Sequence, residues 1–181
     1  MKKTEIKRQL VIEKIADHLL ANGMKEASLR RLAAAAGMSD RMLLHYFVNK
    51  DELLTAALIL ITERLIVMLE GARLEQLPYP ILLPHLAGMM KNPQIRPFLR
   101  LWLELVSLSS GAEAACHAAA QQIRDIFFDW MTAVLKVERE EERKPLAALA
   151  FATIEGLVLL DALDSGSLIE SALEGVKMQN R

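Results

Sequence analysis

Residues 28–54, SLRRLAAAAGMSDRMLLHYFVNKDELL, carry the signals of two short helices separated by a glycine. Ser28 suits the N-cap of a helix over residues 29–36, and Ser39 suits the N-cap of a second helix over about 40–47. Gly37 ends the first helix, because glycine tolerates the left-handed conformation found at helix ends. The spacing therefore predicts two short helices joined by a tight turn.

This helix pair has the pattern of a helix-turn-helix. Ala33 is expected to face the second helix, where only a small side chain lets the two helices approach each other. The small core between them is expected to contain Leu32, Ala36, Met38 and Leu43. A helix-turn-helix places its second helix in the major groove of DNA and its first helix across the backbone. Small-residue helix pairs also occur in ordinary bundles, so the pair alone leaves both interpretations open.

Helix signals continue on both sides of this stretch. Upstream, a stripe of apolar residues at helical spacing predicts a helix over about 4–22 that Gly23 ends: Val11, Ile12, Ile15, Ala16 and Leu19. Downstream, Asn49 and Glu52 have the spacing of a reciprocal capping contact, and the acidic residues there favour a helix N-terminus. A fourth helix is therefore expected from this point to about Gln76.

Further helices are predicted for the rest of the chain, where strand signals are nearly absent. Prolines and capping residues place them at about 81–90, 95–108 and 113–138, then from Pro145 to 163 and at 167–177. The charged run from Glu138 to Lys144 is expected to be a solvated connection, with Pro145 at the first position of the following helix. The predicted fold is all-α, with about nine helices.

The charge is unevenly distributed along the chain. The 181 residues are 52% apolar and 25% charged, which is typical of a folded globular protein. The net charge of −1 excludes a generally basic, histone-like binder. Residues 1–50, however, contain 10 Lys and Arg against 5 Asp and Glu, whereas residues 51–181 contain 12 against 18. An electropositive N-terminal part on an acidic body indicates a polyanion as partner, although it is also consistent with a merely solubilising excess.

Several classes of function are not indicated. One cysteine, Cys116, excludes an internal disulfide framework and fits a reducing cytoplasm; it is expected to be a buried thiol, with a redox sensor as the alternative. The N-terminus lacks the apolar segment of a signal peptide, and the stretch from Leu53 to Ile61 is too short to span a bilayer. The four histidines are too scattered for a helical metal pair, and neither a Gly-rich phosphate loop nor a Gly-x-Ser-x-Gly motif is present. We expect a cytoplasmic protein that is not an enzyme, holds no metal or cofactor and does not enter a membrane.

The strings LAAAAGMS (32–39) and HYFVNKDELL (45–54) resemble the N-terminal domain of TetR-type bacterial transcriptional repressors. The spacing of Arg8, Leu19 and Gly23 in the first helix agrees, so the resemblance covers about residues 8–54. It implies a helix-turn-helix DNA-binding domain over 1–50 and a helical-bundle domain for ligand binding and dimerisation over 51–181.

The resemblance also implies a role for individual residues. Ser28 and Arg30 would lie beside phosphates or a groove edge, and Lys50 would contact a phosphate. The second helix of the pair would present a reading face made of Ser39, Asp40, Arg41, Met42, His45 and Tyr46. Arg41 is long enough to read guanine O6 and N7. For His45 and Tyr46, ordinary packing is the alternative, and Phe47 is expected in the core.

The chain departs from the family pattern in the reading helix. It has Asp40, Arg41 and Met42 where the family usually has Pro or Arg, then Gly, then a small residue, and Leu44 replaces a frequent tyrosine. A phosphate-contacting hydroxyl is therefore missing, and Asp40 repels the backbone unless it accepts a hydrogen bond from cytosine N4 or pairs with Arg41. These departures are expected to change which operator sequence is bound rather than to abolish DNA binding. The alternative is a vestigial domain whose DNA binding has weakened.

The last two predicted helices have the composition of a dimer face. The helix starting at Pro145 is apolar nearly all round, which requires a second covering surface besides the chain's own core. Two copies would form a four-helix bundle, and a dimer is what a helix-turn-helix needs to span two half-sites. The predicted interface consists of Leu149, Thr153, Gly156, Leu157, Leu160, Ile169, Leu173 and Val176.

The resemblance implies a pocket for a small effector among the helices after residue 80. The candidate lining is aromatic and apolar, with a few polar anchors: Phe98, Trp102, Glu104, His117, Phe127, Trp130, Met131, Phe151 and Glu155. Aromatic residues at helical spacing are also ordinary core residues, so both interpretations stay open. Because few polar residues interrupt these helices, an apolar or amphipathic ligand is expected.

Taken with the resemblance, these patterns predict a homodimeric repressor of a palindromic operator in double-stranded DNA. A small apolar or amphipathic effector would release it by moving the fourth helix. Two alternatives remain: a helical small-molecule binding module that has lost operator binding, and a constitutive DNA binder without an effector.

Overall fold

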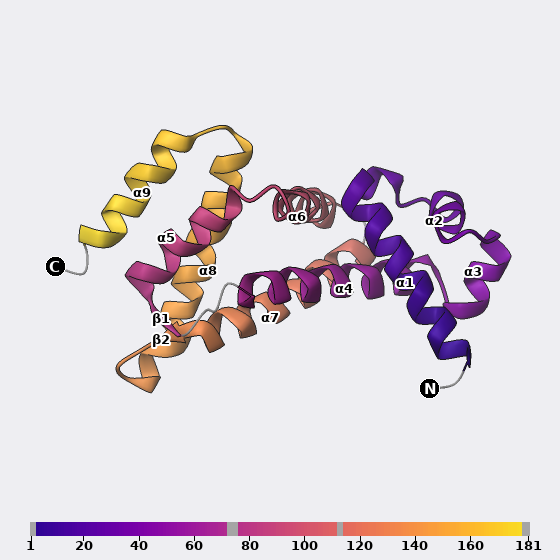
Figure 1. The fold of residues 1–181 in the computed structure, drawn as a ribbon, viewed down its shortest axis with the longest axis horizontal. Coiled ribbons are helices and arrows are strands. Elements are labelled where there is room, and N and C mark those ends of the chain that lie inside the picture. Colours follow the sequence, from indigo (N-terminus) through magenta and orange to yellow (C-terminus); the bar gives the residue numbers. More distant parts are fainter. Residues whose placement is uncertain (1–2, 72–75, 112–113, 179–181) are drawn as a thin grey trace. The chain divides into compact units, whose positions relative to one another are not determined.

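The computed structural model describes residues 3–71, 76–111 and 114–178, and these are almost entirely α-helical (Figure 1). The helices are α1 (Lys3–Asn22), a single 3₁₀ turn η1 (Met24–Glu26), α2 (Leu29–Ala36), α3 (Asp40–Tyr46), α4 (Lys50–Glu70), α5 (Tyr79–Met90), α6 (Arg96–Ser109), α7 (Ala114–Val134), α8 (Glu140–Ala162) and α9 (Gly166–Met178). Two short strands, β1 (Leu77–Pro78) and β2 (Leu135–Lys136), pair in parallel. The predicted all-α fold is confirmed.

The predicted ends are close for the short helices and wrong for three longer ones. α7 ends at Val134, where β2 follows, and not near Glu138. α2 spans the predicted residues, whereas α4 ends at Glu70 and Gln76 is not helical; residues 72–75 lie outside the described part. α8 begins at Glu140, so the run expected to be a connection forms its first turns and Pro145 lies inside the helix. Acidic side chains favour a helix N-terminus, and Arg143 Nε donates to Glu140 Oε1 at 2.7 Å.

The contacts divide the chain into two compact units. Unit 1 comprises Met1–Leu65 and Arg100–Arg124, and unit 2 comprises Ile66–Leu99 and Asp125–Arg181. The chain passes between the units within α4, α6 and α7. The boundary predicted near residue 50 separates a DNA-binding domain from a ligand-binding and dimerisation domain, and it stays a prediction.

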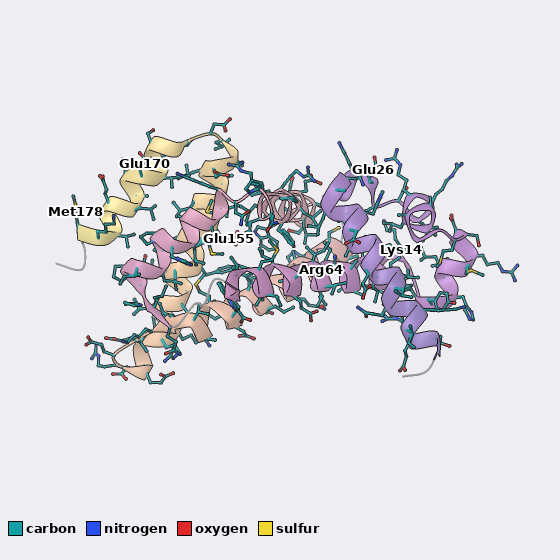
Figure 2. The ribbon with its side chains drawn as sticks, viewed as in Figure 1. Lys14, Glu26, Arg64, Glu155, Glu170 and Met178 are labelled. Atoms are coloured by element: carbon teal, nitrogen blue, oxygen red, sulfur yellow. The ribbon has the colours of Figure 1, made fainter. Side chains whose placement is uncertain are left out.

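Unit 1 has its core between α1 and the short helices that follow it. The fully buried side chains include Ile15 and Leu19 of α1, Leu32 of α2 and Leu43 of α3. Lys14, labelled in Figure 2, donates from Nζ to the carbonyl oxygen of Ala36 at the end of α2, at 3.2 Å. These contacts fix α1 against the helix pair.

Unit 2 is built on α5, α8 and α9, which pack against one another (Figure 1). Leu82, Leu83 and Leu157 are buried among them. The strand pair aligns Leu77 with Leu135. Arg143 Nη1 donates to the carbonyl oxygen of Leu135 at 2.6 Å, so the start of α8 is attached to the end of α7 and β2.

Candidate nucleic-acid interface

The predicted helix-turn-helix is present in unit 1. Gly37, between α2 and α3, has a φ of 74°. Its N–H donates to the carbonyl oxygen of Ala34 and the N–H of Met38 donates to that of Ala33, both at 3.0 Å. Side chains are strained at this φ, so glycine is required for the turn.

The small core predicted for the helix pair is formed largely as expected. Met38 is half-buried, and Ala33 is buried where the two helices approach each other. The other buried side chains at this junction are Leu32, Ala36, Leu43 and Phe47. Phe47 is therefore a core residue, as predicted.

The side of α3 opposite Leu43 is exposed. Arg41 and His45 lie one helical turn apart and are both exposed, as are Asp40 and Met42. Tyr46 is half-buried, and its ring packs edge-on against the His45 ring with centroids 5.4 Å apart. The reading face expected from the sequence is thus accessible on one helix.

Two serines begin the helices of the pair, and they are used differently. Ser39 Oγ accepts a hydrogen bond from the N–H of Met42 at 3.3 Å, so it caps α3 as predicted. Ser28 has extended backbone at the N-cap of α2, but its side chain makes no cap hydrogen bond. Its exposed hydroxyl, and exposed Arg30 in the first turn of α2, are placed to contact an external group.

The N-terminus of α4 is closed by two capping hydrogen bonds. The N–H of Glu52 donates to Asn49 Oδ1 at 2.8 Å, as expected from the sequence. The return bond differs from the prediction, because the Glu52 carboxylate accepts from the N–H of Val48 at 2.6 Å, one residue before Asn49. The two bonds fix the first turn of α4, which carries half-buried Lys50.

Arg8 of α1 completes this corner. Arg8 Nη2 donates to Glu52 Oε1 at 2.7 Å, and its guanidinium lies 4.7 Å from the centroid of the Phe47 ring. The hydrogen bond from Val48, followed by that from Arg8, lowers the pKa of the Glu52 carboxyl below its ordinary value of 4.5. One carboxylate therefore joins α1, the end of α3 and the start of α4.

α6 holds the turn that precedes the helix pair, a contact that sequence reasoning missed. Arg100 Nη2 donates to the carbonyl oxygens of Leu20 and Ala21, at 2.7 and 3.3 Å. Glu104 Oε2 accepts from the N–H of Met24 at 2.6 Å, and Arg100 Nε lies 3.8 Å from Glu104 Oε1. The i, i+4 spacing of Arg100 and Glu104 is the only signal in the sequence, and it does not indicate a partner about 80 residues away.

Gly23 lies at the centre of this contact, which we call the α6 clamp (Arg100 and Glu104). Its φ is 81°, and a Cβ added there would lie 2.5 Å from Glu104 Oε2. The Glu104 carboxylate, predicted to anchor an effector, accepts a hydrogen bond from the backbone at η1.

Ser28 and Lys50, both expected to contact phosphates, line the same open cleft in unit 1, with a volume of about 720 Å³. Glu104 and buried Cys116 also line it. The cleft thus brings together residues from the starts of α2 and α4 with α6 and α7.

The residues expected to line an effector pocket fall in both units. Phe127, Trp130 and Phe151 come together in unit 2, with the Phe127 centroid 5.2 Å from Trp130 and 6.4 Å from Phe151. Trp102 and Glu104 belong to unit 1, as does His117, which is exposed. The remaining candidates in unit 2 are buried or half-buried: Phe98, Met131 and Glu155.

The residues expected at a dimer face are partly exposed. Leu149 and Gly156 are exposed, and Thr153, Leu160, Ile169 and Leu173 are half-buried. Leu157 and Val176 are buried within the chain's own core, so a dimer face on these helices excludes them. The sequence interpretation chose them by apolar character alone, which does not separate the two sides of a helix that is apolar nearly all round.

Residues 12–57 match the model of the family described as bacterial regulatory proteins, tetR family. The resemblance expected over residues 8–54 is thereby confirmed. This segment contains most of α1, the helix pair and the first turns of α4. No curated protein sequence matches the chain.

Solved structures of several other proteins share the fold, and three of them are compared with this chain. One, from Rhodococcus sp., is described as a TetR-family transcriptional regulator; it is 18% identical with a TM-score of 0.74, over 95% of this chain and 97% of that one. A transcriptional regulator from Rhodococcus sp. Rha1 is 22% identical with a TM-score of 0.67, over 94% of each chain. FadR from Bacillus subtilis, solved with stearoyl-CoA, is 16% identical with a TM-score of 0.55, over 93% of this chain and 96% of that one.

Proposed function

We propose that the protein is a DNA-binding transcriptional regulator with the TetR-family fold. It acts in the cytoplasm as a homodimeric repressor of a palindromic operator, and a small apolar or amphipathic effector releases it. Residues 1–50 bind the operator, and residues 51–181 dimerise and bind the effector. The single observation that carries the proposal is the family match over residues 12–57, the segment that forms the helix-turn-helix.

The geometry of α3 supports DNA as the partner. Within α3, Leu43 is buried on the side that faces the core, whereas Arg41 and His45 are exposed on the opposite side. A guanidinium there can donate two hydrogen bonds to guanine O6 and N7. Lys50 and Ser28 line one cleft beside the pair and are suited to positioning contacts with phosphates.

The first experiment selects bound sequences from a random double-stranded DNA library at fixed, moderate salt. We expect a palindrome, and affinity for it that falls with salt with a log–log slope of about −0.9 per phosphate contacted. Arg41→Ala should relax preference at one symmetric pair of positions, and Arg124→Ala, exposed on α7, is the control. A folded protein that enriches no sequence would refute operator binding and favour the small-molecule binding module.

A stripe on α8 supports the dimer. Leu149, Ala152, Gly156 and Leu159 are exposed, and their spacing of three and four residues places them along one side of the helix. Leu163, the residue that follows the helix, is exposed as well. α8 is long and apolar enough to cross a membrane by length and composition alone, and 28% of its most apolar 18-residue window is buried. A second copy of the chain covers such a stripe in a four-helix bundle, and this is the occupant we propose.

The aromatic residues of unit 2 support an effector with an apolar body. Trp130 is buried beside Phe127, and among the described residues its indole N–H has no hydrogen-bond partner; the same holds for His85 Nε2. A buried donor left unpaired costs free energy, and a ligand oxygen would relieve that cost. An amphipathic molecule supplies both the apolar body and the oxygen.

The bound ligand in the FadR structure makes stearoyl-CoA the first probe. We expect it to raise the melting temperature and to release the operator, with coenzyme A alone as control. Trp130→Phe retains the ring but removes the N–H, so it should weaken the response more than Phe128→Leu does. Stabilisation by polar anions only, with no response to acyl compounds, would contradict the effector class.

Release requires that the effector change the spacing of the two recognition helices. We infer that α4 carries this change, because it begins at the capping contact beside Lys50 and ends in unit 2. Amide exchange at residues 48–54 should change when effector binds, and unchanged exchange with full release would point to another route.

A further inference from the structure

The recognition helix exposes two large apolar side chains that the core does not use. Met42 is 54% exposed and Leu44 is 43% exposed, whereas Leu43 between them is fully buried. Successive residues are about 100° apart around a helix. Met42 and Leu44 therefore flank the stripe formed by Arg41 and His45, one on each side.

The chemistry of the major groove offers one apolar partner for such side chains. Among the groups that the bases present there, the C5-methyl of thymine is the apolar one, and the rest are hydrogen-bond donors and acceptors. We propose that Met42 and Leu44 read thymine methyl groups on the two sides of the base pairs that Arg41 and His45 contact. This inference rests on the proposed operator binding.

The charges around the helix favour DNA over an apolar protein partner. Arg30 and Arg41 are exposed on the helix pair, and residues 1–50 contain twice as many basic as acidic residues. An apolar protein surface would leave these cations desolvated without a partner, whereas phosphates pair with them. Met42 and Leu44 would then favour thymine over the other bases. The tyrosine hydroxyl that Leu44 replaces would contact a phosphate and would not distinguish bases.

Deoxyuridine gives the direct test, because it differs from thymidine only in lacking the methyl group. Each thymine of the selected operator is replaced singly by deoxyuridine, and the dissociation constant is measured. Loss of one buried methyl contact should raise the dissociation constant about fourfold. We expect this at one or more symmetric thymines on each side of the bases that Arg41 specifies.

Matched variants assign each methyl group to a side chain. Met42→Ala should make the protein indifferent to the methyl at its thymine while the other thymines keep their effect, and Leu44→Ala should do the converse. Leu10→Ala on α1 removes a side chain of similar exposure, 51%, and should leave every thymine effect unchanged. Melting temperatures of the variants confirm that each is folded.

Each outcome decides the matter. Uridine effects that vanish in the matching alanine variant establish the readout. An operator bound equally well with all thymines replaced, or uridine effects that persist in both alanine variants, overturns it while operator binding stands. Failure of the folded wild type to select any sequence overturns both this inference and the proposed function.

Discussion

At the scale of single residues, Glu52 and Gly23 hold the corners of the helix-turn-helix. The Glu52 carboxylate accepts from the N–H of Val48 and from Arg8, so it satisfies a backbone donor and attaches α1 to α4. Gly23 is the residue at which α6 meets η1; its φ of 81° strains any side chain, and an added Cβ would displace the Glu104 carboxylate. Glu52 acts through its hydrogen bonds and Gly23 through its backbone conformation, and neither residue contributes a side chain to the apolar core.

Glu52 should give the free energy of unfolding a specific pH dependence. Its pKa is lowered in the folded state, so its contribution is complete above pH 4.5 and is lost as the pH falls through the folded-state value. Glu52→Gln should cost about 1 kcal/mol at neutral pH, a modest figure because the carboxylate is partly exposed. Urea unfolding at several pH values should show the gap from the wild type closing in acid. A gap independent of pH would contradict the role; Glu63→Gln, exposed on the same helix, is the control.

Gly23 and Gly37 should respond differently to alanine. Gly37→Ala meets only backbone strain, about 1 kcal/mol, because the nearest atom to an added Cβ is Lys14 Nζ at 3.9 Å. Gly23→Ala adds displacement of the Glu104 carboxylate from Met24, so it should be more destabilising. In a Glu104→Ala background the extra cost should disappear. Equal costs in both backgrounds, measured by chemical denaturation, would show that the close approach does not matter.

At the scale of elements, the positions where the short helices begin and end could be predicted from the sequence, and long-range polar contacts could not. The residues of α2 follow from Ser28 and Gly37, since a cap and a stop are local signals. The sequence predicts the start of α8 at Pro145, because proline suits the first turn of a helix. α8 begins at Glu140 instead, where three glutamates stabilise the helix N-terminus. The α6 clamp joins residues 80 apart, and no periodic pattern encodes such a pairing.

The α6 clamp should stabilise the turn before the helix pair. Arg100→Ala leaves the carbonyl oxygens of Leu20 and Ala21 without this donor, and we expect a loss of about 1 kcal/mol. Amide exchange at residues 20–26 should accelerate. Lys91→Ala, which removes an exposed cation at the end of α5, serves as control. Unchanged exchange in that turn would mean that α6 does not hold it.

At the scale of the whole molecule, the fold could be predicted and its surfaces only in part. Helix spacing and the family resemblance were sufficient for an all-α chain. The predicted dimer face rests on apolar composition, so it combines the exposed Leu149 with the buried Leu157 and leaves out the exposed Leu159. Which side of an apolar helix faces outward depends on how α5 and α9 pack on it, and the sequence of α8 does not contain that information.

Gly156→Arg should convert the dimer to a monomer. An added Cβ at Gly156 meets no atom within 4 Å in the chain itself, so the variant is expected to fold, and the arginine would be buried only between two copies. Light scattering should report half the mass. Gly88→Arg, also in open space on α5, should remain dimeric. A dimer that persists in Gly156→Arg would place the interface elsewhere.

Under the proposed dimerisation through the exposed stripe of α8, protein abundance becomes a regulatory variable. While most chains are monomeric, the number of dimers rises with the square of the chain concentration, by mass action. Occupancy of a two-half-site operator is then expected to rise more steeply than linearly with expression level. A modest change in synthesis or degradation of the protein would therefore switch its target over a narrow range of copy number, before any small molecule binds.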